Sequence, residues 1–72
     1  MKVKYPVGFK TPINKYFTPM LIHVTRGKLK HVRGRVINTF RAGDVFVESN
    51  NGGEYYVQNI GKKPVILNVG VI

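Results

Sequence analysis

The sequence predicts an all-β fold, a small barrel or sandwich built from short antiparallel strands. Short segments rich in Val, Ile, Tyr, Phe and Thr are separated by turn residues, among them 8 glycines and 4 prolines. No stretch carries the sustained apolar spacing of a helix, and regular turn signals between short strands are typical of sandwiches and barrels. Because the chain has only 72 residues, we expect residues 1–72 to form a single domain.

The first half of the chain is expected to hold three strands. Met1–Tyr5 is a short strand that ends before a proline, and residues 7–18 form a loop-rich segment. Met20–Thr25 and Lys28–Val32 follow, joined by a turn at Gly27, and we expect them to pair as a hairpin.

The second half is expected to hold four strands. Arg35–Phe40 follows an Arg-Gly turn, and a Gly-Asp turn then leads into Val45–Glu48. Residues 49–53 are rich in Asn and Gly, which adopt positive φ readily, so they form a loop. Glu54–Gln58 and Pro64–Ile72 complete the set.

Side-chain alternation within these strands separates an inner from an outer face. Successive side chains of a strand point to opposite faces, so Met20 and His23 lie on different faces. Glu54 prefers water, which turns Tyr55 and Val57 toward the interior.

The chain is strongly basic, with 12 Lys and Arg against 3 Asp and Glu and a net charge of +9. This charge favours polyanionic partners, with a merely solvated surface as the alternative. Tyr56, on an outer face, is the one aromatic side chain suited to stacking on a base. The densest basic segment contains Arg26, Lys28, Lys30, Arg33 and Arg35.

A chain this short has a marginal core, and without cysteine it gains no disulfide. A homodimer or larger homo-oligomer that shares apolar surface is therefore expected. The apolar run Pro64–Ile72 is a candidate for that surface; it is equally suited to be the last core strand, and both can hold. No apolar run approaches the roughly 20 residues of a membrane-spanning helix, and the N-terminus lacks a secretory signal, so we expect no membrane insertion and a cytoplasmic location.

The titratable residues form no recognisable catalytic set. His23 and His31 are expected at the surface or in an interface, with a proton shuttle or metal clip across the hairpin as the alternative. Glu48 and Glu54 flank one loop, and we interpret them as solvated rather than as an acid/base pair. Asp44 is expected to bond the backbone of its own turn.

Two ordered sets of residues resemble the two motifs of the cupin family of small β-barrels. In the first motif a Gly precedes two His and a Glu, all metal ligands, and a second Gly closes it. Gly8 and Gly27 match the two glycines, whereas Asn14, Tyr16 and Met20 stand at the ligand positions. In the second motif Gly43, Gly52 and Asn59 match, and Tyr55 stands at the His position.

This resemblance implies a cupin-like jelly roll whose metal ligands are replaced. Met and Tyr are poor substitutes for His and Glu, so we expect no metal, no cofactor and no metal-dependent catalysis. In the barrel the four replacing side chains converge, and their chemistry suits a small organic ligand, although a small barrel is often filled by its own side chains. These candidate pocket residues are Asn14, Tyr16, Met20 and Tyr55.

The sequence therefore predicts a non-catalytic binding or assembly module with a strongly basic surface. Its expected partner is an acidic protein or another anionic surface. Two alternatives stay open: nucleic-acid binding through the basic segment, and small-ligand binding or metal-independent catalysis in the barrel pocket.

Overall fold

The structure is a computed structural model and describes residues 1–13, 19–48 and 53–71. Each expected strand is present, with its ends shifted by at most two residues. No helix in the described residues is long and apolar enough to cross a membrane. The strands are β1 (Lys2–Tyr5), β2 (Met20–Arg26), β3 (Lys28–Arg33), β4 (Val36–Arg41), β5 (Val45–Glu48), β6 (Tyr56–Asn59) and β7 (Val65–Val71).

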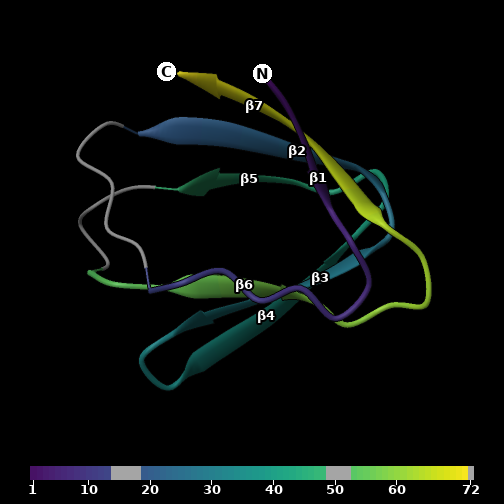
Figure 1. Ribbon diagram of the computed structural model, residues 1–72. Coiled ribbons are helices and arrows are strands. Elements are labelled where there is room, and N and C mark those ends of the chain that lie inside the picture. The colour runs from purple at the N-terminus through teal and green to yellow at the C-terminus, as the bar shows by residue number, and fades with distance from the viewer. Residues whose placement is uncertain (14–18, 49–52, 72) are drawn as a thin grey trace.

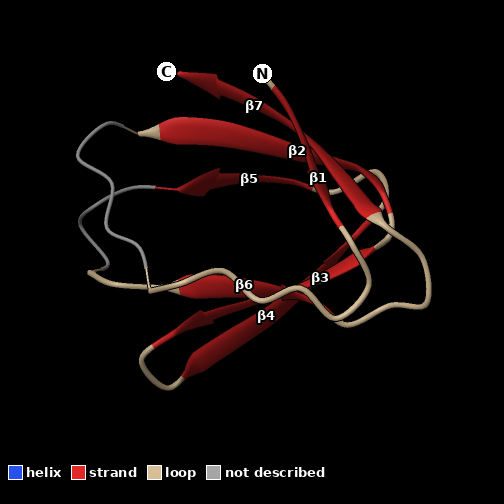
Figure 2. Ribbon diagram, in the orientation of Figure 1, coloured by secondary structure: helices blue, strands red, loops and turns tan. Residues whose placement is uncertain are grey.

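These strands form two antiparallel sheets that face each other, one above the other in Figure 1. The upper sheet has the order β1-β7-β2-β5 and the lower sheet the order β4-β3-β6. Figure 2 shows that loops and turns make all the described connections between strands. The expected all-β barrel or sandwich is confirmed.

Strands β2 and β3 do not pair with each other, so the expected hairpin between them is wrong. β2 lies between β5 and β7 in the upper sheet, while β3 lies between β4 and β6 in the lower one. One long hairpin instead folds back at Gly34–Arg35 and bends halfway, so that β3 pairs with β4 and β2 with β5. Two local features make the bend at the β2–β3 corner: a register shift beside Thr25 and a positive φ of 89° at Gly27. Strands that switch between sheets commonly turn their corners through such bulges.

The segment before the first gap in the described residues extends the lower sheet. The Thr11 N–H donates to the Val57 carbonyl at 2.9 Å, and the Asn59 N–H donates to the Phe9 carbonyl at 2.9 Å. Lys10 forms an isolated bridge with Gln58. Residues 9–11 therefore run along the edge of β6, where the sequence suggested only loop.

The core lies between the two sheets. Val65 and Leu67 of β7 are buried in it, which confirms that the C-terminal run supplies a core strand. Tyr55 and Val57 point inward as expected, and Phe40 and Phe46 pack against the same core. The other buried apolar side chains are Ile22, Val24 and Leu29.

Candidate functional site: a buried charged cluster and an exposed basic groove

A charged cluster lies in the barrel interior and joins the two sheets. Glu48 ends β5 in the upper sheet, and its side chain is only 1% exposed. Its Oε2 lies 2.5 Å from Nε2 of His31, and its Oε1 accepts a hydrogen bond from Nη2 of Arg33. His31 and Arg33 both belong to β3 in the lower sheet. The carboxylate therefore uses both oxygens to hold the opposite sheet.

Aromatic rings enclose this cluster. The His31 ring stacks on Tyr55, with centroids 5.0 Å apart, and meets the Phe46 ring edge-on at 5.7 Å. Phe40 and Phe46 stack on each other at 4.0 Å, and the Arg33 guanidinium lies 5.1 Å from the Tyr55 ring centroid. Apolar walls lower the local dielectric, so removing one charge of the cluster would leave its partners poorly compensated.

The cluster corrects two sequence expectations. His31 is 6% exposed and is not a surface residue, whereas His23 is exposed as expected. Glu48 is buried and ion-paired, not solvated, whereas Glu54 is exposed. Strand parity could have revealed both: His31 and Arg33 share a face with Leu29, and Glu48 shares a face with Phe46.

Two of the four candidate pocket residues line one interior cavity. Met20 and Tyr55 border a hollow of about 130 Å³ together with Tyr5 and Thr11. Ligand pockets typically enclose about 300–1,000 Å³, so this cavity is small for an organic ligand. Asn14 and Tyr16 lie outside the described residues.

The described residues at the barrel interior do not fit a transition metal. Both oxygens of Glu48 and Nε2 of His31 are engaged with each other or with Arg33. The Tyr55 phenol, with an ordinary pKa of about 10, is a poor ligand for a hard divalent ion, and Met20 supplies only a soft thioether. Among residues 1–13, 19–48 and 53–71, no group of three or more His, Cys, Asp or Glu could hold a metal ion.

The five residues of the basic segment do not form one surface. Arg33 turns inward to Glu48, and its side chain is 24% exposed. Lys28 and Lys30 are half-buried on the outer face of β3, while Arg26 and Arg35 are exposed at opposite ends of that strand. A strand rises about 3.3 Å per residue, so the length of β3 separates these two arginines by roughly 16 Å. Tyr56, the candidate for base stacking, is half-buried with the Lys10 Nζ 4.3 Å from its ring centroid.

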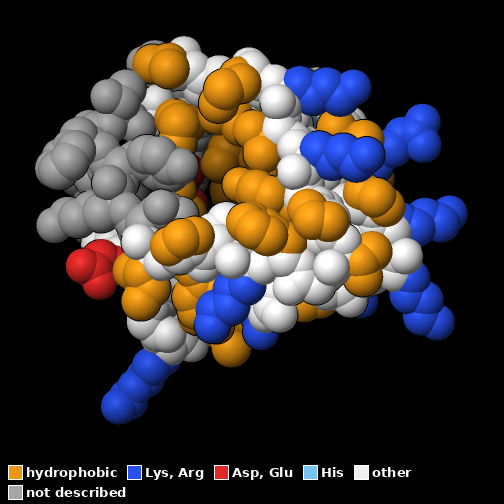
Figure 3. Space-filling view, in the orientation of Figure 1, with side chains coloured by type: hydrophobic (Ala, Val, Ile, Leu, Met, Phe, Trp, Pro, Cys, Tyr) orange, Lys and Arg blue, Asp and Glu red, His pale blue; other side chains and the backbone are white. Residues whose placement is uncertain are grey.

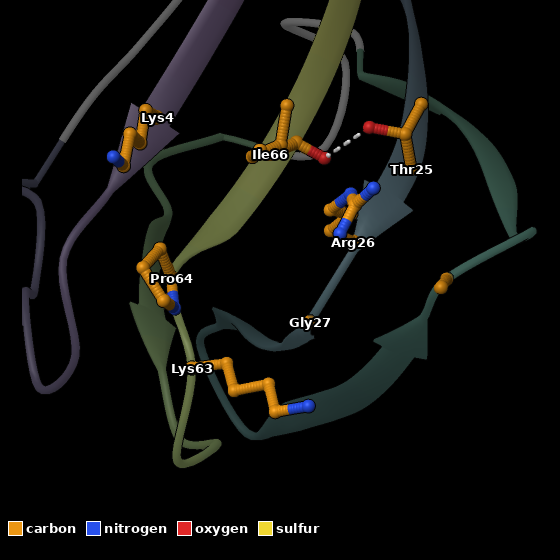
Figure 4. Close-up of a pocket in the computed structure, with 8 residues that line it drawn as sticks. Lys4, Thr25, Arg26, Gly27, Lys63, Pro64 and Ile66 are labelled. Atoms are coloured by element: carbon orange, nitrogen blue, oxygen red, sulfur yellow. Dashed lines mark hydrogen bonds between the residues drawn. The ribbon is translucent and has the colours of Figure 1, made fainter.

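A different set of cations meets at the β2–β3 corner. Lys4, Arg26 and Lys63 line a groove of about 430 Å³ whose apolar part includes Pro64 and Ile66; we call it the corner groove. Figure 4 shows these three cations around Ile66 and Pro64. In Figure 3 the Lys and Arg side chains gather at the right of the view, at the end where the β6–β7 turn lies.

Local geometry builds this groove. Thr25 Oγ1 donates to the Ile66 carbonyl at 3.1 Å, and the register shift beside Thr25 places Arg26 opposite Ile66. Lys4 pairs with Ile66 from the other side, so Ile66 lies between two cations across three neighbouring strands. Strict alternation would have placed Arg26 on the inner face with Ile22 and Val24, but Arg26 is exposed.

The motif residues that survive support turns. The Asp44 carboxylate accepts a hydrogen bond from the Arg41 N–H at 2.7 Å, which confirms its expected turn role. The buried Asn59 donates from Nδ2 to the carbonyls of Tyr5 and Lys63 and accepts from the Gly61 N–H, so it fastens the β6–β7 turn.

Solved structures share this arrangement of strands. The cupin domain of Schizosaccharomyces pombe Cnp3 matches with a TM-score of 0.81 and 26% identity, over 94% of this chain and 47% of that one. Drosophila melanogaster CENP-C bound to CAL1 matches with a TM-score of 0.82 and 19% identity, over 99% of this chain and 59% of that one. A cupin superfamily protein of Desulfitobacterium hafniense matches with a TM-score of 0.79 and 13% identity, over 99% and 63%.

The fold is cupin-like. The resemblance seen in the turn residues is thereby confirmed at the level of fold. This cupin-like chain spans between 47% and 63% of the length of the three solved chains it matches. No protein-family profile and no curated protein sequence matches it.

Proposed function

We propose that this cupin-like chain is a non-catalytic binding and assembly module that self-associates through the outer face of β2 and β5. The observation that carries the proposal is an apolar patch on that face, formed by Leu21, Val45 and Val47. These side chains are 45%, 54% and 56% exposed, and Leu21 pairs directly with Val47 across the strands. Larger contiguous apolar patches on a protein surface commonly mark interaction sites.

The partner that fits this patch is a second copy of the chain. Two molecules of charge +9 repel each other, and this repulsion is weakest where the contact carries no Lys or Arg. The strand neighbours of the patch on this face are His23, Asn68 and Gly70, and none of them is a Lys or Arg. β5 also ends the sheet order, and its outward residues carry none of the charges that usually protect an edge strand.

Other features support a binding role over a catalytic one. Both oxygens of Glu48 are paired with residues of the opposite sheet, His31 and Arg33, which indicates that this carboxylate serves to join the two sheets. CENP-C, which shares this fold, has been solved bound to the protein CAL1. The cytoplasmic location expected from the sequence stays a prediction.

Sedimentation velocity on the purified chain tests the proposal. We expect a dimer or larger oligomer near physiological salt, and dissociation to monomer in Val47→Lys, which places a cation in the patch. Val36→Lys is the matched control, because Val36 is a similarly exposed strand valine, at 61%, on the other sheet. A monomeric parent chain, or equal dissociation in both variants, would count against self-association through this face.

A further inference from the structure

The corner groove continues into a second basic hollow. That hollow has a volume of about 410 Å³, and Lys28, Lys62 and Lys63 line it together with Ile60. Lys63 borders both hollows, and so does Gly27. The two hollows thus form one basic surface around the contact between the β2–β3 corner and the β6–β7 turn.

Opposite charge is missing from this surface. The residues lining either hollow include no Asp or Glu. In the described parts of the chain, the salt bridges found involve Glu48 with His31 and Arg33 only. Among the described residues, five cations and no carboxylate therefore line the two hollows: the exposed Lys4, Arg26, Lys62 and Lys63, and the half-buried Lys28.

An apolar floor accompanies the cations. Ile66 lies between Lys4 and Arg26, Pro64 lines the same groove, and Ile60 borders the second hollow. A phosphate backbone needs cations and gains from aromatic side chains on which bases stack, yet no aromatic residue lines either hollow. A peptide with carboxylates on either side of an apolar side chain would contact both the cations and the apolar residues of the groove.

We propose that the corner groove binds an acidic peptide segment of a partner protein, with an apolar side chain of the peptide on Pro64 and Ile66 and its carboxylates on Lys4, Arg26 and Lys63. This inference rests on the proposed function as a binding module and assigns it a partner class. The groove is exposed on the outer face of β1, β7 and β2, so the peptide needs no opening of the barrel.

Fluorescence anisotropy with a labelled glutamate-rich peptide that carries one central leucine tests the proposal. We expect binding that weakens as salt rises, because the contacts are largely electrostatic. Arg26→Glu should weaken it by about tenfold or more, since a like charge replaces an attractive one. Arg35→Glu is the matched control: Arg35 is also an exposed arginine beside a turn glycine, but it lies outside both hollows.

A second groove variant and two controls can overturn the proposal. Lys63→Glu changes a groove residue in the β6–β7 turn, away from the bulge beside Thr25, and should reproduce the loss of peptide affinity. Urea unfolding of each variant shows whether it is still folded. Equal loss in Arg35→Glu would show that net charge alone drives binding and would overturn the proposal. Equal affinity for an all-glutamate peptide would remove the role of the apolar floor and overturn the assigned class.

A nucleic-acid arm separates the competing class of partner. Single- and double-stranded oligonucleotides that bind more tightly than the peptide, and that lose affinity in Arg26→Glu and Lys63→Glu, would overturn the proposal in favour of a nucleic-acid surface. The result of the peptide-binding experiment is independent of the sedimentation test, because a monomer can still bind the peptide and an oligomer can fail to bind it.

Discussion

At the scale of single residues, the barrel interior is organised around a buried ion-pair cluster. The two sheets are joined by ion pairs of Glu48 with His31 and Arg33. Without these ion pairs, only van der Waals contacts would hold the sheets together at this position. Burying charges costs desolvation free energy, so such a cluster stabilises the fold only while every partner is present. The cluster therefore defines which substitutions the core tolerates.

Replacing Glu48 with glutamine tests that role. Glu48→Gln removes the buried negative charge that pairs with His31 and with the Arg33 guanidinium. We expect the free energy of unfolding to fall by about 3–5 kcal/mol, measured from the urea midpoint. Glu54→Gln, at an exposed carboxylate, is the control and should change stability by less than about 0.5 kcal/mol. Equal midpoints for the two variants would mean that the cluster contributes nothing to stability.

Sequence reasoning could have reached this cluster. Leu29 has to be buried, and residues of the same parity in its strand are His31 and Arg33. Charged and imidazole side chains usually lie in solvent, but this rule holds only when no partner faces them from another strand. The partner, Glu48, lies 15 residues beyond Arg33 in the chain, and nothing local links the two.

At the scale of elements, turn chemistry is local and pairing is not. Glycines, prolines and the Asn-Gly pair at positions 51 and 52 mark the ends of strands because they act on their own backbone. Whether β3 pairs with β2 or crosses to the other sheet depends instead on the residues that pack against the β2–β3 corner. The carbonyl of Pro64 approaches Gly27 so closely that a Cβ there would lie 2.9 Å from it. That contact comes from a turn 37 positions along the chain, which no short-range pattern reveals.

The corner gives a prediction with an internal control. Gly27 and Gly43 have similar φ values of 89° and 99°, but only Gly27 has neighbours within 4 Å of a built Cβ. Both alanine variants carry backbone strain of roughly 1–3 kcal/mol, and Gly27→Ala adds the clash with Pro64 and Val65. We expect the urea midpoint of Gly27→Ala to fall clearly below that of Gly43→Ala. Indistinguishable midpoints would show that the corner can open at no cost.

At the scale of the whole molecule, the cations gather by folding and not by sequence density. The densest basic segment is divided between the interior, the outer face of β3 and both ends of that strand. The corner groove draws its cations from β1, the end of β2 and the β6–β7 turn. The net charge can be counted from the sequence, whereas the corner groove cannot be read from it, because its cations come together only through the topology.

The concentration of positive charge gives a last prediction, on stability against salt. Mutual repulsion within a chain of charge +9 destabilises the compact state, and salt screens it as the Debye length falls from about 30 Å at 0.01 M to about 10 Å at 0.1 M. We expect the urea midpoint to rise over this range at fixed protein concentration. The double variant Lys2→Gln, Arg35→Gln removes two exposed cations outside both hollows, so its midpoint should start higher and rise less. A midpoint that falls with salt would mean that attraction at Glu48 outweighs the repulsion among the surface cations.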